Sequence, residues 1–301
     1  MASGWYSVPL VTEGPSSIGP SPSGASRIPV TIVIAVAVIL FGLLAYLGWI
    51  NKTASTKAAT PVTLPSTPYP VGTPSKHSPS RFAPPGALAM PGYRLSYVAD
   101  FSTSGIPKGW DLFKGEPGGD PGAQLSPTHV GVYDGKLVLA TYRDKAYGNR
   151  WVTGGLCQCG RPSLYGAYFV RSRVTGPGPN EVQLLWPANN QWPPEIDFNE
   201  SSSISHTTAT VHWGVGNYIL QTHLKGIDLT KWNTWGVVWT PKKIVYVLNG
   251  RAWGAITTPG AVPHMKMTLN LEQRTECTIH RQCPRRPVQM LVAWIAEFHR
   301  R

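Results

Sequence analysis

Three carboxylates stand within six residues in the stretch Glu195-Ile196-Asp197-Phe198-Asn199-Glu200. Like charges held close together raise each other's pKa, so such a cluster is costly unless the protein uses it. Two uses are known: dividing acid and base work between carboxyl groups, and holding a cation such as calcium, which prefers oxygen ligands. A solvated polar face is the remaining alternative.

The stretch is otherwise built for a buried strand, in which side chains alternate between two faces. Glu195 and Asp197 then share one face, and strict alternation places Glu200 on the other. We predict a β-bulge around Phe198-Asn199 that returns Glu200 to the first face. The Cα atoms of Glu195 and Glu200 are then roughly 13 Å apart, and each side chain can incline toward the other by about 4 Å. The two carboxyl groups are therefore expected to lie roughly 5 Å apart.

This separation matches the ~5–5.5 Å found between the carboxyl groups of retaining glycosidases. In that chemistry one glutamate attacks the anomeric carbon, while the other donates a proton to the leaving oxygen and then activates water. Asp197 lies between them, where it can share a proton with the nucleophile and help to keep the two pKa values apart.

Short alternating segments recur from residue 97 to residue 298. Trp235, Val237 and Trp239 fall on one face of such a segment, and Asn249-Gly250 is a strong hairpin signal between two others. No long amphipathic helix follows residue 50. The pattern predicts an all-β sandwich.

The run from residue 184 to residue 200, LLWPANNQWPPEIDFNE, resembles the signature of glycoside hydrolase family 16, the laminarinase- and lichenase-like β-glucanases, in its ExDxxE variant. Residues 164–173, 211–213, 232–250 and 290–298 are similar to further strands of that family, in the expected order. The resemblance covers residues 97–298. It implies a concanavalin-like β-jelly roll of two curved antiparallel sheets, with a cleft on the concave face.

Carried over residue by residue, the resemblance implies that Glu195 is the nucleophile, Asp197 an assisting carboxylate and Glu200 the general acid/base. It implies a place near the cleft for His212, and Trp192 and Trp213 are the candidate sugar platforms. No catalytic metal and no cofactor are expected.

Two positions depart from the family pattern. The closing strand often carries an aspartate that helps to bind a structural calcium, whereas this chain has Ala293, which argues against that ion. Asn199 is more polar than the residue commonly found before the last glutamate. We expect it to occupy the bulge and face outward.

Ile28 to Ile50 is an uncharged stretch of 23 residues. As a helix it would be about 34 Å long, enough to cross a ~30 Å hydrocarbon core, and it exceeds the about 7–15 apolar residues of a cleaved signal peptide. The sequence therefore predicts a single-pass anchor, with a cleaved signal as the alternative.

The division that follows is a short tail (1–27), a transmembrane anchor (28–50), a disordered Pro/Ser/Thr-rich linker (51–91) and a catalytic domain (92–301). One cation, Arg27, precedes the predicted anchor closely, and two, Lys52 and Lys57, follow it. Because cytoplasmic flanks are usually richer in cations, this weakly favours a cytoplasmic location for the C-terminal side. The stalk-like linker, the cysteines and the polysaccharide-type site favour the outside, and we predict a catalytic domain outside the cell.

All four cysteines lie in the predicted domain. Cys277 and Cys283 bracket a short loop and could form a local disulfide, whereas Cys157 and Cys159 are expected to be too close to bond easily with each other. Cross-pairing of the two groups, free thiols and a zinc site with His280 are the alternatives, although the spacings differ from common zinc patterns.

The formal net charge is +12. The cations are scattered, so a solvated face or retention near an anionic surface is expected, and no nucleic-acid partner. The leading hypothesis is a membrane-anchored, monomeric endo-β-glucanase that cleaves β-1,3 or mixed β-1,3/1,4 bonds with retention. The alternatives are a transglycosylase that remodels cell-wall or exopolysaccharide glycans, and a non-catalytic carbohydrate-binding module.

Overall fold

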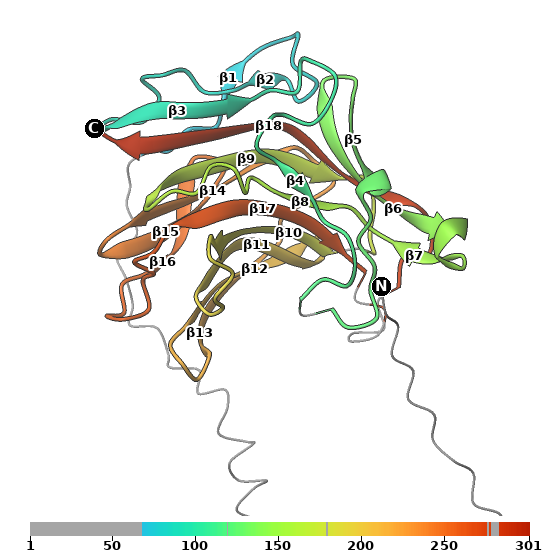
Figure 1. Cartoon of the computed structure of the whole chain (residues 1–301). Coiled ribbons are helices and arrows are strands. Elements are labelled where there is room, and N and C mark those ends of the chain that lie inside the picture. Colours follow the sequence, from blue (N-terminus) through green and yellow to red (C-terminus); the bar gives the residue numbers. More distant parts are fainter. Residues whose placement is uncertain (1–67, 119, 179, 276, 278–282) are drawn as a thin grey trace, which may run out of the picture. The chain divides into compact units, whose positions relative to one another are not determined.

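The computed structural model describes residues 68–301 except 119, 179, 276 and 278–282. Two antiparallel β-sheets are layered on each other, as Figure 1 shows. The only helical turns among these residues are two short 3₁₀ segments, Pro127–His129 (η1) and Lys145–Tyr147 (η2). An antiparallel all-β sandwich, the architecture expected of a jelly roll, is therefore confirmed.

The first sheet has the strand order β13-β12-β11-β10-β17-β8-β4 and is called the cleft sheet below. In chain order its strands are β4 (Asp111–Leu112), β8 (Gly155–Cys157), β10 (Asn180–Pro187), β11 (Glu195–Ser203), β12 (His206–Trp213), β13 (Tyr218–Lys225) and β17 (Met267–Arg274). β11, which carries the acidic stretch, lies between β10 and β12 near one end of the order.

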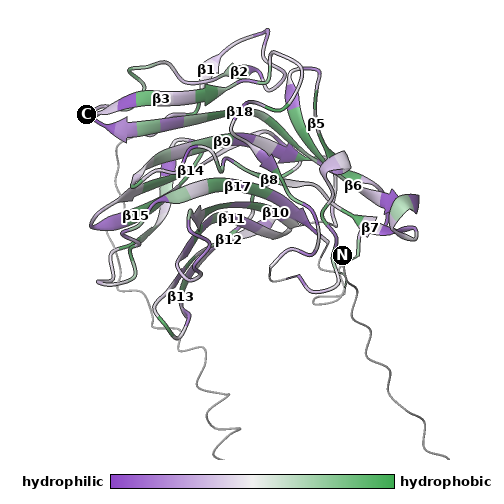
Figure 2. Ribbon diagram, viewed as in Figure 1, coloured by the Kyte–Doolittle hydropathy of each residue, from purple (hydrophilic) through white to green (hydrophobic). Residues whose placement is uncertain are grey.

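The second sheet has the order β16-β15-β14-β9-β18-β6-β5, with β3 beside β18 and β7 beside β6. We call it the outer sheet. Its strands are β3 (Tyr93–Ala99), β5 (Val130–Tyr133), β6 (Lys136–Asp144), β7 (Arg150–Val152), β9 (Gly166–Val174), β14 (Asn233–Thr240), β15 (Lys243–Leu248), β16 (Arg251–Ile256) and β18 (Val288–Arg300). Figure 2 shows hydrophobic residues along much of β18, whereas hydrophilic residues dominate β12.

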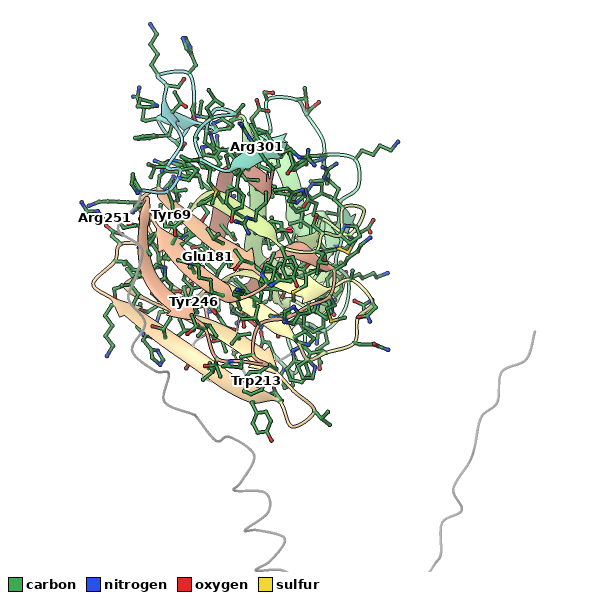
Figure 3. All side chains as sticks on the ribbon, turned by 90° about the vertical axis from the view of Figure 1, so that its left-hand side faces the viewer. Tyr69, Glu181, Trp213, Tyr246, Arg251 and Arg301 are labelled. Carbon is green, nitrogen blue, oxygen red and sulfur yellow. A yellow bond between two sulfur atoms is a disulfide. The ribbon has the colours of Figure 1, made fainter. Side chains whose placement is uncertain are left out.

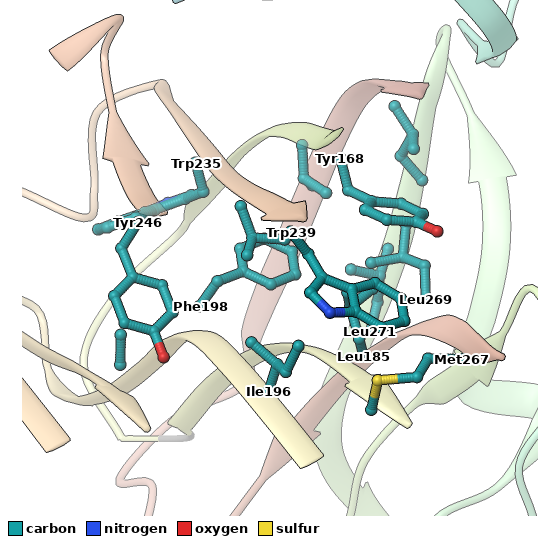
Figure 4. Close-up of a cluster of buried hydrophobic side chains, with 14 of the residues drawn as sticks. Tyr168, Leu185, Ile196, Phe198, Trp235, Trp239, Tyr246, Met267, Leu269 and Leu271 are labelled. Atoms are coloured by element: carbon teal, nitrogen blue, oxygen red, sulfur yellow. The ribbon is translucent and has the colours of Figure 1, made fainter. Parts of the chain in front are cut away.

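The main core lies between the two sheets. Trp235, Val237 and Trp239 of β14 all point into it, as the alternation predicted. Figure 4 shows the rings of Trp235 and Trp239 in the same cluster as Ile196 and Phe198 of β11, both fully buried. Burying a large apolar side chain contributes about 1.5–3 kcal/mol. These contacts therefore fix which face of β11 turns inward, and leave the opposite face to Glu195 and Asp197.

The predicted hairpin at Asn249-Gly250 is also confirmed, because it joins β15 to β16. Both residues have positive φ, 48° and 83°, as a two-residue hairpin turn with the right twist requires.

Residues 68–91 lie in the range expected to be a disordered linker, yet they cover the outer sheet. β1 (Thr73–Pro74) pairs with β2 (Phe82–Ala83), and the Trp294 indole N–H donates to the Phe82 carbonyl oxygen over 3.0 Å. Beneath this segment lies a second apolar cluster that includes Trp294 and Ala293. The expected boundary at residue 92 is therefore wrong, because residues 68–91 pack on this apolar surface.

The rest of the predicted linker, the tail and the predicted anchor at residues 28–50 lie outside the described residues. In the part of the chain that is described, no helix is long and apolar enough to span a membrane.

Two disulfides are present. Cys277–Cys283 forms as the local bond that the loop allowed, while Cys157–Cys159 corrects the expectation for that pair. The chain turns after β8, so the Cα atoms of Cys157 and Cys159 are 5.1 Å apart, which lies within the range that a disulfide accepts. The zinc and free-thiol alternatives fail, since all four sulfurs are bonded.

Candidate active site

The bulge in β11 is where it was predicted. Against β10, Asn199 pairs with Gln183 and Asp197 with Leu184, which leaves Phe198 as the extra residue. Against β12, the register also shifts by one residue between Asp197 and Glu200. As a result, Glu195, Asp197 and Glu200 all line one cleft.

This cleft has a volume of about 690 Å³ and lies over the cleft sheet. Its floor comes from alternate residues of neighbouring strands, including Thr210 and His212 of β12, Ile219 and Gln221 of β13, and Thr268, Asn270, Glu272 and Arg274 of β17. Trp186 and Trp192 also line it, as do five residues of the loop after β4: Phe113, Lys114, Glu116, Pro117 and Gly118.

Glu195 is 7% exposed, and the indole N–H of Trp192 donates to its Oε2 over 2.7 Å. Burial raises the pKa of Glu195, while the nearby His212 and the Trp192 N–H favour the ionised form. Trp192 is itself 42% exposed, so it presents a ring to the cleft while it holds the carboxylate.

Asp197 is 3% exposed, and its Oδ2 lies 3.6 Å from Nε2 of His212. The other ring nitrogen of His212, Nδ1, lies 2.9 Å from Oδ1 of Asn217, which orients the ring. Burial, followed by the charges of Glu195 and Glu200, holds the pKa of Asp197 well above its ordinary value. A protonated Asp197 can donate a hydrogen bond to an ionised Glu195, so we assign the shared proton to Asp197.

Arg274 was missed by the sequence reasoning. Its Nη1 lies 3.5 Å from Oε1 of Glu200, and its Nε donates to Oε2 of Glu272 over 3.0 Å. Burial disfavours the charged guanidinium, but Glu272 and Glu200 outweigh burial and hold the pKa of Arg274 above its ordinary value. The signal was present in the sequence, because Thr268, Asn270, Glu272 and Arg274 alternate with apolar or inward residues along β17.

Two expected positions differ from the structure. Trp213 lies outside the cleft lining, because it follows His212 on β12 and therefore points to the opposite face. It packs beside Tyr218 and the core, and Figure 3 shows it at the lower end of the sandwich. Asn199 is fully buried and not outward-facing, because both residues of the bulge turn toward the interior.

Two groups of three potential metal ligands occur among the described residues. Asp111 with Cys157 and Cys159 is one, but its sulfurs are joined to each other. The other is Glu195, Asp197 and His212, whose ligand atoms lie within 4.8 Å of one another and coincide with the acidic cluster. Ala293 stands where the resemblance implies an aspartate ligand for calcium; it offers no side-chain oxygen and is 2% exposed within an apolar cluster.

No model of a known protein family matches the sequence, and no curated protein matches it. Solved structures do match. The laminarinase from Rhodothermus marinus is 16% identical with a TM-score of 0.62, and the match covers 69% of this chain and 98% of that chain. The endo-β-1,3-glucanase from Pyrococcus furiosus is 18% identical with a TM-score of 0.59, covering 69% and 95%.

A non-specific endo-β-1,3(4)-glucanase of family GH16 is also similar, at 18% identity and a TM-score of 0.62, covering 83% of this chain and 98% of that one. At these identities the likeness concerns the fold. The chain therefore has the fold of the glycoside hydrolase family 16 laminarinases and endo-β-glucanases.

Proposed function

We propose that this protein hydrolyses internal β-1,3 or mixed β-1,3/1,4 bonds of β-glucans, with retention of anomeric configuration. The observation that carries the proposal is the bulge that brings Glu195, Asp197 and Glu200 to the wall of one cleft. The endo-β-1,3- and endo-β-1,3(4)-glucanases with the same fold support the choice of substrate.

In the first step, a carboxylate oxygen of Glu195 attacks the anomeric carbon as the bond to the leaving oxygen breaks. Glu200 gives its proton to that oxygen, and the sugar becomes an ester of Glu195. In the second step, water attacks the anomeric carbon as the ester bond to Glu195 breaks, and Glu200 takes a proton from that water. Glu195 leaves as a carboxylate, and Glu200 is protonated again.

The partners of Glu195 suit this role. The Trp192 N–H and a protonated Asp197 both donate to the carboxylate and stabilise its ionised form before attack. Arg274 keeps one positive charge beside Glu200 and Glu272. The rings of Trp186 and Trp192 offer flat apolar faces to sugars.

The test is digestion of laminarin and lichenan by the full-length chain, with the first-formed product analysed by NMR. The β-anomer is expected first, and Glu200→Gln should release no sugar from either polymer. Inverted product, or equal sugar release by wild type and Glu200→Gln, contradicts the proposal. Products longer than a defined starting oligosaccharide identify a transglycosylase, and binding without cleavage identifies a carbohydrate-binding module.

We also propose that residues 28–50 anchor a monomeric enzyme in the membrane with its domain outside the cell. The basis is the uncharged stretch of 23 residues in the sequence. Protease treatment of intact cells should remove the domain and leave a membrane-bound fragment. Recovery of the whole chain in the soluble fraction contradicts this proposal.

A further inference from the structure

The backbone of Glu200 is held by two threonine side chains from the next strand. Its N–H donates to Oγ1 of Thr207 over 3.1 Å, and its carbonyl oxygen accepts from Oγ1 of Thr208 over 3.3 Å. Both threonines belong to β12, next to the point where the register of β11 shifts. We call Thr207 and Thr208 the threonine clamp.

The Thr207 hydroxyl is shared between the two residues that end the bulge. While it accepts from the Glu200 N–H, it donates to Oδ1 of Asn199 over 2.6 Å. Thr207 and Asn199 are both fully buried, so water does not replace either bond. One hydroxyl therefore fixes the inward turn of Asn199 and the outward turn of Glu200 at the same time.

This arrangement accounts for the polar residue at position 199. An apolar side chain there would leave the Thr207 hydroxyl with only the more distant Thr208 carbonyl oxygen, 3.3 Å away, as an acceptor. With Asn199 present, the hydroxyl donates over the shorter 2.6 Å to Oδ1 of Asn199, and a lone pair is left for the Glu200 N–H.

From these contacts we propose that Thr207, held by Asn199, is a positioning residue for Glu200 in the acid/base steps. The inference rests on the proposed function. Thr207 does not line the cleft, so its effect on the reaction passes through the backbone of Glu200. Displacing a catalytic group by about 1 Å can cost on the order of 10²-fold in rate.

A positioning role predicts a selective loss. Dinitrophenolate departs without protonation, so a substrate that carries it as leaving group does not need a general acid. Formation of the glycosyl-enzyme from a dinitrophenyl β-glycoside of a glucan oligosaccharide therefore depends on Glu195 and not on Glu200. Thr207→Val removes the hydroxyl at nearly constant volume. In the full-length chain it should lower kcat on lichenan by about 10- to 100-fold, leave KM within about twofold, and leave the dinitrophenolate burst rate within about threefold.

Three further measurements sharpen the experiment. Azide attacks the glycosyl-enzyme without help from a base, so it should restore steady-state turnover of the dinitrophenyl substrate by Thr207→Val. Thr207→Ser keeps the hydroxyl and should recover most of the kcat on lichenan. Thr222→Val, on β13 and outside the bulge, should behave as the wild type, which controls for the loss of a strand hydroxyl.

Thr208→Val removes only the bond to the Glu200 carbonyl, and Thr208 is partly exposed, so this variant tests the clamp if Thr207→Val folds poorly. It should show the same selectivity with a smaller loss. Equal losses on both substrates, or no loss on either, overturn the inference while the proposed function stands. A wild type that cleaves neither substrate overturns the proposed function and the inference together.

Discussion

The cleft sheet buries carboxyl groups on both of its faces, and the two sets differ in access. On the cleft face, Glu195 and Asp197 are 7% and 3% exposed and line a cavity of about 690 Å³. On the inner face, Glu181 of β10 is fully buried between the sheets, and Figure 3 shows it within the body of the sandwich.

Burial raises the pKa of the carboxyl groups in both sets, and that of Glu181 to about 7. Their neighbours differ. Ser172 and Gln183 donate to the same oxygen of Glu181, and no cleft reaches it. Glu195 and Asp197 lie beside His212 and the Trp192 N–H, and both border the cleft. A raised pKa is therefore a result of burial on either face, and only the cleft set combines it with room for a substrate.

The sharpest way to break this comparison is a matched pair of substitutions. Glu195→Gln removes the attacking carboxylate and should lower kcat on laminarin on the order of 10⁴-fold. Glu181→Gln should keep activity within about twofold of the wild type, measured as reducing-sugar release. Comparable activity losses in the two variants would mean that the two faces are not functionally distinct.

Next in size is the effect of Asp197. Asp197→Ala removes the proton donor beside Glu195 and should lower kcat by about 10²-fold. Asp197→Asn keeps a donor that does not titrate, so it should lose less, and its rate should fall less than that of the wild type as the pH rises. Steady-state rates of all three proteins across the pH range check this. An alanine variant as active as the asparagine variant would argue against the donor role.

Arg274 tests the balance of charge in the cleft. Arg274→Gln leaves Glu272 and Glu200 without their cation, and should lower the free energy of unfolding at pH 7 by about 3 kcal/mol. The double variant Arg274→Gln/Glu272→Gln should recover part of that loss. Denaturant midpoints measure both, and unchanged stability in the single variant would show that the ion pairs contribute nothing.

The smallest effect concerns Glu181 and stability. Its pKa is about 7 in the folded protein, against an ordinary value of 4.5, so between these pH values the folded state keeps a proton that the unfolded state has released. Stability therefore falls as the pH rises from about 4.5 to about 7, and then levels off.

Glu181→Gln should flatten that decline, as urea unfolding at several pH values would show. Glu297, whose pKa burial also raises to about 7, titrates in both proteins, so the difference between them isolates Glu181. Parallel stability curves for wild type and Glu181→Gln would contradict the raised pKa.

Local patterns predicted much of the fold and the centre of the site. The faces of β11 and β14, the bulge at Phe198 and the Asn249-Gly250 turn follow from alternation and turn chemistry within a few residues. Arg274 lies near Glu200 only because β10 pairs with β17. The acidic stretch alone therefore could not predict that Arg274 is a neighbour of Glu200.

The other errors have two origins. Trp213 was expected to be a sugar platform from the family resemblance, but it follows His212 on β12, and adjacent strand residues face opposite sides. Residues 68–91 have the composition of a linker, but the apolar outer face of β18 and β15 supplies the contacts that order them. The order of residues 68–91 therefore depends on a tertiary surface that local composition does not reveal.

The central claim is that Glu195 forms the covalent bond to the sugar, and trapping that bond tests it most directly. The full-length protein would be treated with a 2-deoxy-2-fluoro glucan oligosaccharide that carries a good leaving group, and its peptides analysed by mass spectrometry. The account predicts one added sugar on the peptide that contains Glu195, and none in Glu195→Gln. A label on another residue, or a wild type that hydrolyses laminarin without ever being labelled, would contradict it.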